Sequence, residues 1–99
     1  MHDILPEEQK YFQRIYNICA DMAEFYGFGK IETPILEEAD LFSRGIGLST
    51  DVVQKQMYSF KTKGDDFLAL RPEGTAPVVR SYIEHGMFNL PQPLKLWYF

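Results

Sequence analysis

The chain has few of the features that mark secreted, membrane or nucleic-acid-binding proteins. Cys19 is its single cysteine, so neither an intrachain disulfide nor a thiolate metal cage can form within it. No apolar run approaches the roughly 20 residues of a membrane span, and charges interrupt residues 1–30, where a signal peptide would need an apolar core. The ten Lys and Arg are scattered and the net charge is −4, which does not favour a nucleic-acid-binding surface. These absences predict a soluble, cytoplasmic protein with no membrane contact and no metal site.

The chain does contain enough apolar and aromatic residues for a folded core. Of its 99 residues 45% are hydrophobic, including eight Phe and six Tyr, which argues against disorder. A chain of this length makes at most one domain. We therefore expect residues 1–99 to form a single domain with one modest core.

The longest regular pattern is an amphipathic helix that begins at Pro6. Proline suits the first turn of a helix, and Glu7 and Glu8 suit the positive end of its dipole. Apolar residues then recur at three- and four-residue steps, which predicts a helix of about five turns that ends at Gly27. Its apolar side consists of Tyr11, Phe12, Ile15, Ile18, Cys19, Met22, Phe25 and Tyr26. We interpret Cys19 as a small core residue.

Short strands and a hairpin are expected in the middle of the chain. Residues 30–33 suit a strand that ends at Pro34, and residues 35–42 fit either extended chain or a short helix. Residues 43–51 are typical of a loop, and Asp51 could cap a helical turn. Two strand-like segments, 57–60 and 66–70, flank the polar residues 61–65, which predicts a hairpin. The acidic pairs at 37–38 and 65–66 are interpreted as solvated.

A second helix and a last strand complete the expected elements. The helix should cover residues 75–87, and residues 94–99 should form a strand that ends in three aromatics. Such an end normally leads into a partner strand, so we expect the chain to be a piece of a longer enzyme. The whole pattern predicts an α+β fold with a mainly antiparallel sheet flanked by two helices. The inner side of the second helix is expected to carry Val78, Val79, Tyr82, Ile83 and Met87.

The turn from strand to helix at residues 71–75 is the strongest candidate for a site. Its residues alone allow two interpretations. In the first, Thr75 caps the helix and Glu73 is a solvated carboxylate of the first turn. In the second, Glu73 neutralises the ammonium group of an amino-acid ligand, while the Thr75 hydroxyl and the nearby backbone orient it. His85, near the end of the same helix, is interpreted as a capping or packing residue.

Together with its flanks, this turn resembles one known family, the histidyl-tRNA synthetases. The similar segments follow one another in order and cover essentially the whole chain. They are Asp3–Pro6, Gly27-Phe28, Ile31–Ile35, Leu41–Gly47, Asp51–Val53, Met57–Phe60, Leu70–Thr75, Arg80, Ile83–Gly86 and Leu96–Tyr98.

The resemblance implies the N-terminal part of a class II aminoacyl-tRNA synthetase catalytic domain, from motif 1 to just before motif 2. The implied function is that of a histidine–tRNA ligase, which activates histidine with ATP and transfers it to tRNA-His. ATP and Mg²⁺ are the implied cofactors of the complete enzyme. The arginines of motifs 2 and 3 would lie beyond Phe99, so we expect no catalytic residue here, no bound cofactor and little activity from this segment alone.

The resemblance also implies roles for individual residues. Glu73, Gly74 and Thr75 match the family segment that holds the histidine substrate by its amino group. Arg71 is expected to be a supporting cation beside them.

Gly27, Ile31 and Pro34 fall in motif 1, the element that builds the homodimer interface in class II enzymes. A helix with an apolar stripe suits that role, because it offers the stripe to a symmetry mate. A plain core helix is equally compatible with the same sequence.

Two other functions remain open. The synthetase-like regulatory subunit of ATP phosphoribosyltransferase shares this fold without performing ligation, although its corresponding turn usually departs from Glu-Gly-Thr. The other alternative is a stand-alone module that dimerises through its motif 1 surface.

Overall fold

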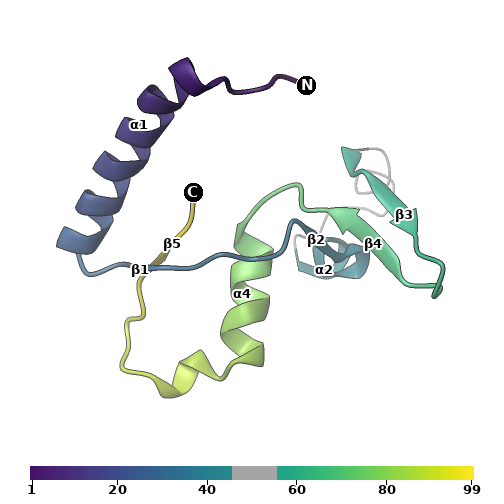
Figure 1. Ribbon diagram of the computed structural model, residues 1–99. Helices are drawn as coiled ribbons and strands as arrows, with labels where there is room; N and C mark the ends of the chain where they lie inside the picture. The colour runs from purple at the N-terminus through teal and green to yellow at the C-terminus, as the bar shows by residue number, and fades with distance from the viewer. Residues whose placement is uncertain (46–55) are drawn as a thin grey trace. The chain divides into compact units, whose positions relative to one another are not determined.

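The computed structural model describes residues 1–45 and 56–99 (Figure 1). The chain divides into two compact units, Met1–Ile31 with Pro93–Phe99, and Glu32–Gln92. Each is described by itself. The expected helical turn at Asp51, most of the expected loop over 43–51 and the family-like residues 46–47 and 51–53 lie outside the described residues. In the part that is described, no helix has the length and apolarity needed to cross a membrane.

The first unit is built on helix α1 (Pro6–Phe25), which begins at the predicted Pro6 and ends two residues before the predicted stop at Gly27. Glu8 accepts the backbone N–H of Leu5 at 3.1 Å, which satisfies one of the donors left open at the helix start. At the other end Gly27 adopts a left-handed conformation, with φ of 77°. The N–H of Gly27 donates to Glu24 and that of Phe28 to Ala23, the paired bonds of a Schellman motif.

Two short parallel strands follow α1 in this unit. Strand β1 (Gly29–Lys30) pairs with β5 (Leu96–Trp97), with Gly29 opposite Leu96. The Tyr16 ring of α1 lies 5.9 Å from Trp97 and 5.4 Å from Phe99, between ring centroids. The aromatic end of the chain therefore packs on α1.

The apolar stripe of α1 lies mainly on the exposed side of the helix. Ile15, Ile18 and Met22 are each more than half exposed, and Cys19 is exposed as well. The expectation that Cys19 is a core residue is wrong, because the helix packs through Tyr16 instead.

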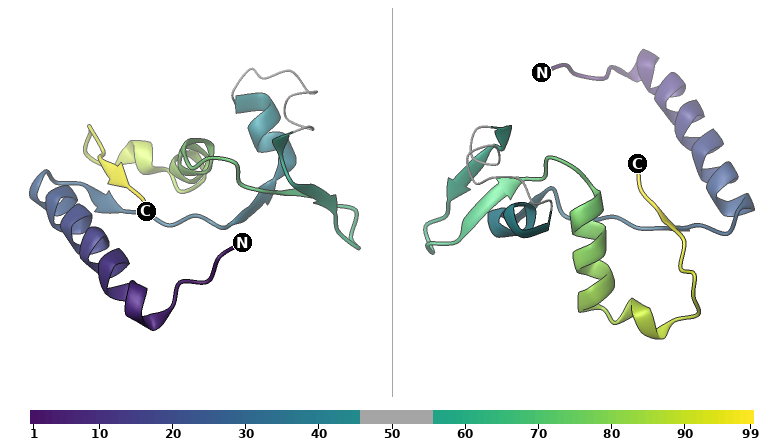
Figure 2. Two further views of the ribbon diagram at one scale, coloured as in Figure 1. Left: turned by 90° about the horizontal axis from the view of Figure 1, so that it is seen from above. Right: turned by 180° about the vertical axis from the view of Figure 1, so that it is seen from behind.

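The second unit contains a three-stranded antiparallel sheet in the order β2-β4-β3. Its strands are β2 (Leu36–Glu38), β3 (Ser59–Lys61) and β4 (Phe67–Leu70), and β3 and β4 form the predicted hairpin. Residues 35–42 are extended first and helical afterwards, since α2 (Ala39–Gly45) follows β2 directly. Figure 2 shows α2 beside β2 and β4, and contacts join it to both strands. Helix α4 (Thr75–Glu84) and the 3-10 turn η1 (Met87–Asn89) complete the unit.

The hairpin turn is held by the side chain of one residue. The Thr62 hydroxyl accepts the backbone N–H groups of Gly64 and Asp66, each at 3.2 Å. Asp65 takes the left-handed conformation that this tight turn requires, with φ of 68°. This local chemistry explains why the hairpin is predictable from sequence.

The core of the second unit is small. Phe42 of α2 is 1% exposed and Ala69 of β4 is fully buried, and Ala39 and Pro77 are buried as well. Among the described residues, Phe42 is therefore the one large ring in this core, and the other core residues are small.

Two expectations about the fold need correction. The α+β class holds, but the expected single, mainly antiparallel sheet is only partly borne out, because the described residues form one antiparallel sheet of three strands and one parallel sheet of two. Helix α4 buries Pro77 and Ser81, whereas Val79 and Ile83 of the predicted inner side are 50% and 61% exposed. The α-helix also ends at Glu84, because Gly86 turns left-handed with φ of 61°.

Replacing Gly27 by Ala should destabilise the protein through the backbone alone. A Cβ at this position meets nothing within 4 Å, but its φ of 77° is unfavourable for an L side chain by about 1–2 kcal/mol. Gly29→Ala is the matched control, since φ there is not positive and the nearest atoms lie at 3.9 Å. Urea unfolding followed by circular dichroism should show Gly27→Ala as less stable than Gly29→Ala by about 1–2 kcal/mol. Equal midpoints would contradict the assigned conformation.

Candidate functional site

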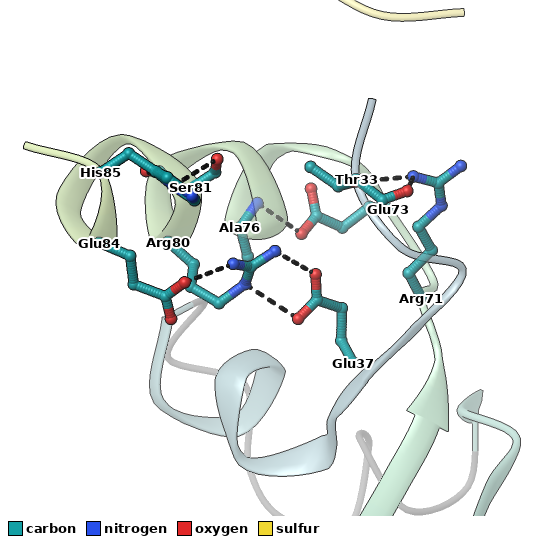
Figure 3. A network of polar contacts seen from close by, with 9 residues as sticks. All are labelled: Thr33, Glu37, Arg71, Glu73, Ala76, Arg80, Ser81, Glu84 and His85. Atoms are coloured by element: carbon teal, nitrogen blue, oxygen red, sulfur yellow. Dashed lines mark hydrogen bonds and ion pairs between the residues drawn. The ribbon is translucent and has the colours of Figure 1, made fainter. Parts of the chain in front are cut away.

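The candidate turn connects β4 to α4, and Arg71 ties it to the segment before β2. The Arg71 backbone N–H donates to the carbonyl of Ile35 at 2.9 Å. Its guanidinium Nη1 donates to Thr33 twice, to the carbonyl at 3.0 Å and to Oγ1 at 2.7 Å (Figure 3). Arg71, the first residue of the turn, is therefore half-buried and anchored to Thr33 and Ile35.

Glu73 caps helix α4 with its own side chain. One carboxylate oxygen accepts the N–H of Thr75 at 2.5 Å, and the other accepts that of Ala76 at 2.9 Å. Gly74 occupies the N-cap position and has no side chain with which to cap. The simpler sequence interpretation is therefore wrong in naming Thr75 as the cap, because the half-exposed Glu73 supplies the capping oxygens. A carboxylate at the positive end of the helix dipole is also favourable.

The candidate residues open onto a cavity of about 630 Å³ along one side of α4. Glu73 and Thr75 lie at the end of the cavity next to the N-terminus of α4, and Glu84 lies on the last turn of that helix. Between them the wall is mostly apolar. The cavity is lined by Leu41, Glu73, Thr75, Ala76, Val79, Arg80, Ile83 and Glu84. Val79 and Ile83, exposed against the sequence prediction, form part of this wall.

A buried ion pair between β2 and α4 was not predicted from the sequence. Arg80 donates to Glu37 through Nε at 3.0 Å and through Nη2 at 2.7 Å (Figure 3). The same guanidinium donates through Nη1 to Glu84, one turn along α4, at 2.8 Å. The side chain of Glu37 is 7% exposed and that of Arg80 is 23% exposed, whereas that of Glu84 is 56% exposed. The interpretation of Glu37 as a solvated turn residue is therefore wrong.

The hydrogen bonds that Arg80 donates to the Glu37 carboxylate are the main cause of a raised pKa at Arg80, with burial opposing them. A guanidinium already titrates above the pH range in which proteins fold. Because the pKa of Arg80 is raised further, the charged guanidinium contributes its full stability at all lower pH values. The free energy of unfolding therefore gains no pH dependence from Arg80 between pH 5 and 9.

The remaining predicted residues fall in different places. His85 Nδ1 lies 3.0 Å from the Ser81 carbonyl oxygen and next to the C-terminus of α4, which agrees with a capping residue. Gly27 and Ile31 belong to the first unit and Pro34 to the second. Glu73 and Thr75 share one cavity, with Gly74 between them in the chain.

Comparison with known proteins identifies the family. The family model described as histidyl-tRNA synthetase matches residues 1–99. The chain belongs to the histidyl-tRNA synthetase family. A relative in the same family, a histidine–tRNA ligase of Staphylococcus aureus (strain JH9), is 59% identical over 97 residues, which cover 97% of this chain and 23% of the relative.

Solved structures of the histidyl-tRNA synthetase family agree with the fold. The crystal structure of apo S. aureus histidyl-tRNA synthetase matches with a TM-score of 0.84 at 48% identity, over 99% of this chain and 23% of that one. A Bacillus halodurans C protein, titled as an ATP phosphoribosyltransferase regulatory subunit/histidyl-tRNA synthetase, matches at 28% identity with a TM-score of 0.79, over 99% and 24%. The chain spans about a quarter of the length of the relatives it matches.

Loss of the Glu37 charge should destabilise the protein far more than loss of the Glu84 charge. Glu37→Gln leaves the partly buried Arg80 without its main partner, and removing one partner of a buried pair costs about 3–5 kcal/mol. Glu84→Gln removes an exposed partner of the same guanidinium, and such a pair is worth about 0–1 kcal/mol. Thermal and urea unfolding of the two variants measure the difference. A larger loss of stability in Glu84→Gln would contradict the assigned burial.

Proposed function

We propose that the protein carrying this chain is a histidine–tRNA ligase, and that Glu73, Gly74 and Thr75 bind the amino group of histidine. The observation that carries the site assignment is the Glu73 carboxylate, which lies at the mouth of α4 on the wall of an apolar cavity. Membership of the histidyl-tRNA synthetase family supports the reaction, and the chain's share of its relatives makes the whole reaction a proposal.

The carboxylate of Glu73 has acceptor capacity left for a ligand. A carboxylate offers about four lone-pair sites, and the amides of Thr75 and Ala76 occupy two of them. An ammonium group brings three donors and can use the others. Because the hydrogen bonds from the two backbone N–H groups already fix the carboxylate, little side-chain entropy is lost when the ammonium binds.

The surroundings of the carboxylate suit a free amino acid. The Thr75 side chain lines the same end of the cavity and can orient the ammonium with its hydroxyl. The apolar wall beyond it suits the carbon atoms of the ligand. Selectivity for the imidazole ring is not assigned to any residue of this chain.

In the proposed reaction, the ammonium anchor orients the histidine carboxylate. That carboxylate attacks the α-phosphorus of ATP, pyrophosphate leaves, and the tRNA terminal ribose then takes the histidyl group. Glu73 also favours the protonated amine, which keeps the amine from competing as a nucleophile. The contribution of this chain is positioning, which can supply several kcal/mol of the barrier reduction.

The remaining parts of the proposal concern cofactors and partners. The complete enzyme uses ATP with Mg²⁺, which would stabilise charge on the phosphates, and acts on tRNA-His in the cytoplasm. In residues 1–45 and 56–99 no three His, Cys, Asp or Glu gather as metal ligands, so we assign no residue to Mg²⁺. We also propose a class II homodimer formed through the element that contains Gly27, Ile31 and Pro34. The exposed apolar stripe of α1 supports that interface.

Histidine binding should depend on the pairing of Glu73 with the ligand amine. Calorimetric titration of the natural protein carrying this chain should give at least tenfold weaker L-histidine binding for Glu73→Gln, because a desolvated charge pair is worth about 2–5 kcal/mol. Gln keeps one acceptor for the helix cap, so the fold is largely preserved.

The matched control is a ligand without the amine, imidazole-4-propionate. Wild type and Glu73→Gln should bind it with equal affinity, since neither forms the ammonium pair. A Glu73→Gln variant that weakens both ligands alike, or neither, would remove the assigned role of Glu73.

A chain of residues 1–99 alone should not catalyse histidine activation. Its relatives are about four times longer, and the expected motif 2 and 3 arginines lie outside these residues. Histidine-dependent exchange of labelled pyrophosphate into ATP should stay at background for this segment, while the S. aureus relative serves as the positive control. Exchange at a rate close to that of the relative would overturn this part of the proposal.

A further inference from the structure

We propose that Arg80 and Glu37 are positioning residues for the amino-acid site, which they hold in place through helix α4. The inference rests on the proposed function of Glu73. Neither residue belongs to the predicted histidine-binding set, and their pairing is visible only in the structure.

The turn that carries Glu73 is anchored on both sides to one short segment, residues 33–37. Before the turn, Arg71 donates to Thr33 through its guanidinium and to Ile35 through its backbone. After the turn, Arg80 donates to Glu37 through two nitrogens. In the chain, Glu73–Thr75 therefore lies between Arg71 and Arg80, which both form hydrogen bonds with residues 33–37 (Figure 3).

Strand pairing closes this arrangement into a ring of fixed contacts. Glu37 of β2 lies directly opposite Ala69 of β4, which is fully buried. The chain then runs from β4 through Arg71 and the turn into α4, and Arg80 returns to Glu37. A shift of α4 against the sheet must break this return contact.

In the part of the chain that the structure describes, buried apolar packing constrains the rotation of α4 only modestly. Its buried residues, Pro77 and Ser81, are small, Val78 and Tyr82 are half-buried, and Val79 and Ile83 are exposed along the cavity. A guanidinium that binds a carboxylate through two parallel hydrogen bonds fixes both distance and angle. Glu84 cannot do this, because it lies on α4 itself. The orientation of the helix mouth therefore depends on the Glu37 bonds.

A pair that only stabilised the fold would behave differently from a positioning pair. Buried ion pairs can often be replaced by apolar residues of similar size with little loss of stability. Such a replacement keeps α4 docked but removes the directional bonds. The replacement separates the two roles. Ammonium binding requires a fixed orientation of the N-terminal end of α4, where Glu73 lies, whereas the stability of the fold does not.

The test compares three variants of the natural protein that carries this chain. Arg80→Lys keeps the charge without the planar fork, and Glu37→Met/Arg80→Met keeps the volume without the charges. Arg44→Lys is the matched control, since Arg44 forms an exposed pair with Asp40 on α2 at 3.6 Å. For each we would measure the melting temperature and, by calorimetry, the affinities for L-histidine and imidazole-4-propionate.

We expect both variants at position 80 to unfold cooperatively and to bind L-histidine about tenfold more weakly. Their affinity for imidazole-4-propionate should stay within about twofold of wild type, as should both affinities of Arg44→Lys. The ligand that carries the ammonium would thus be the one affected, which a purely structural role does not explain.

Three outcomes would overturn the inference. If L-histidine binding survives in both variants while Glu73→Gln loses it, the proposed function stands and the positioning role falls. If both variants lose cooperative unfolding, or weaken the two ligands alike, the pair serves the fold and not the mouth of α4. If wild type itself does not distinguish the two ligands, the proposed function fails and this inference fails with it.

Discussion

The second unit depends on the ion pair between Glu37 and Arg80. Among the residues that the structure describes, its buried apolar core consists of one phenylalanine and a few small residues, so the burial seen there specifies the orientation of α4 only loosely. A carboxylate that is 7% exposed needs its partner, because an unpaired buried charge is far more costly than an unpaired surface charge. The pair therefore selects one docking of α4 on the sheet, and with it the placement of the turn at residues 73–75.

Elements specified by local chemistry could be predicted from the sequence. Helix α1 follows from Pro6, two acidic residues and a glycine whose left-handed φ ends the helix. The β3–β4 hairpin follows from a polar turn in which one threonine hydroxyl satisfies two backbone donors. The turn at residues 71–75 was recognisable as a strand-to-helix junction for the same reason. In each case the deciding contacts lie within about five residues of one another.

Contacts between distant residues could not be predicted in this way. Glu37 and Arg80 are 43 positions apart, and nothing around Glu37 distinguishes it from the exposed Glu38 beside it. The period of apolar residues in α4 indicates a stripe but does not say whether the stripe faces a core or a cavity. The pairing of Arg80 with Glu37 turns another side of α4 toward the sheet, and Val79 and Ile83 line a cavity. The same limit applies to α1, which packs through Tyr16 and leaves its stripe exposed.

Glu73 caps α4, and in the proposed function the same side chain also binds the ligand. By accepting the amides of Thr75 and Ala76, it places a negative charge on the positive end of the α4 dipole. A helix N-terminus normally attracts anions, so a ligand carboxylate would compete for it. Here the Glu73 carboxylate already neutralises the N-terminus of α4, and its remaining lone pairs can accept hydrogen bonds from a group in the cavity. In the proposed function, the N-terminus of α4 would therefore favour the cationic end of a zwitterion, which would direct the ligand's carboxylate away from the helix and leave it open to attack phosphorus.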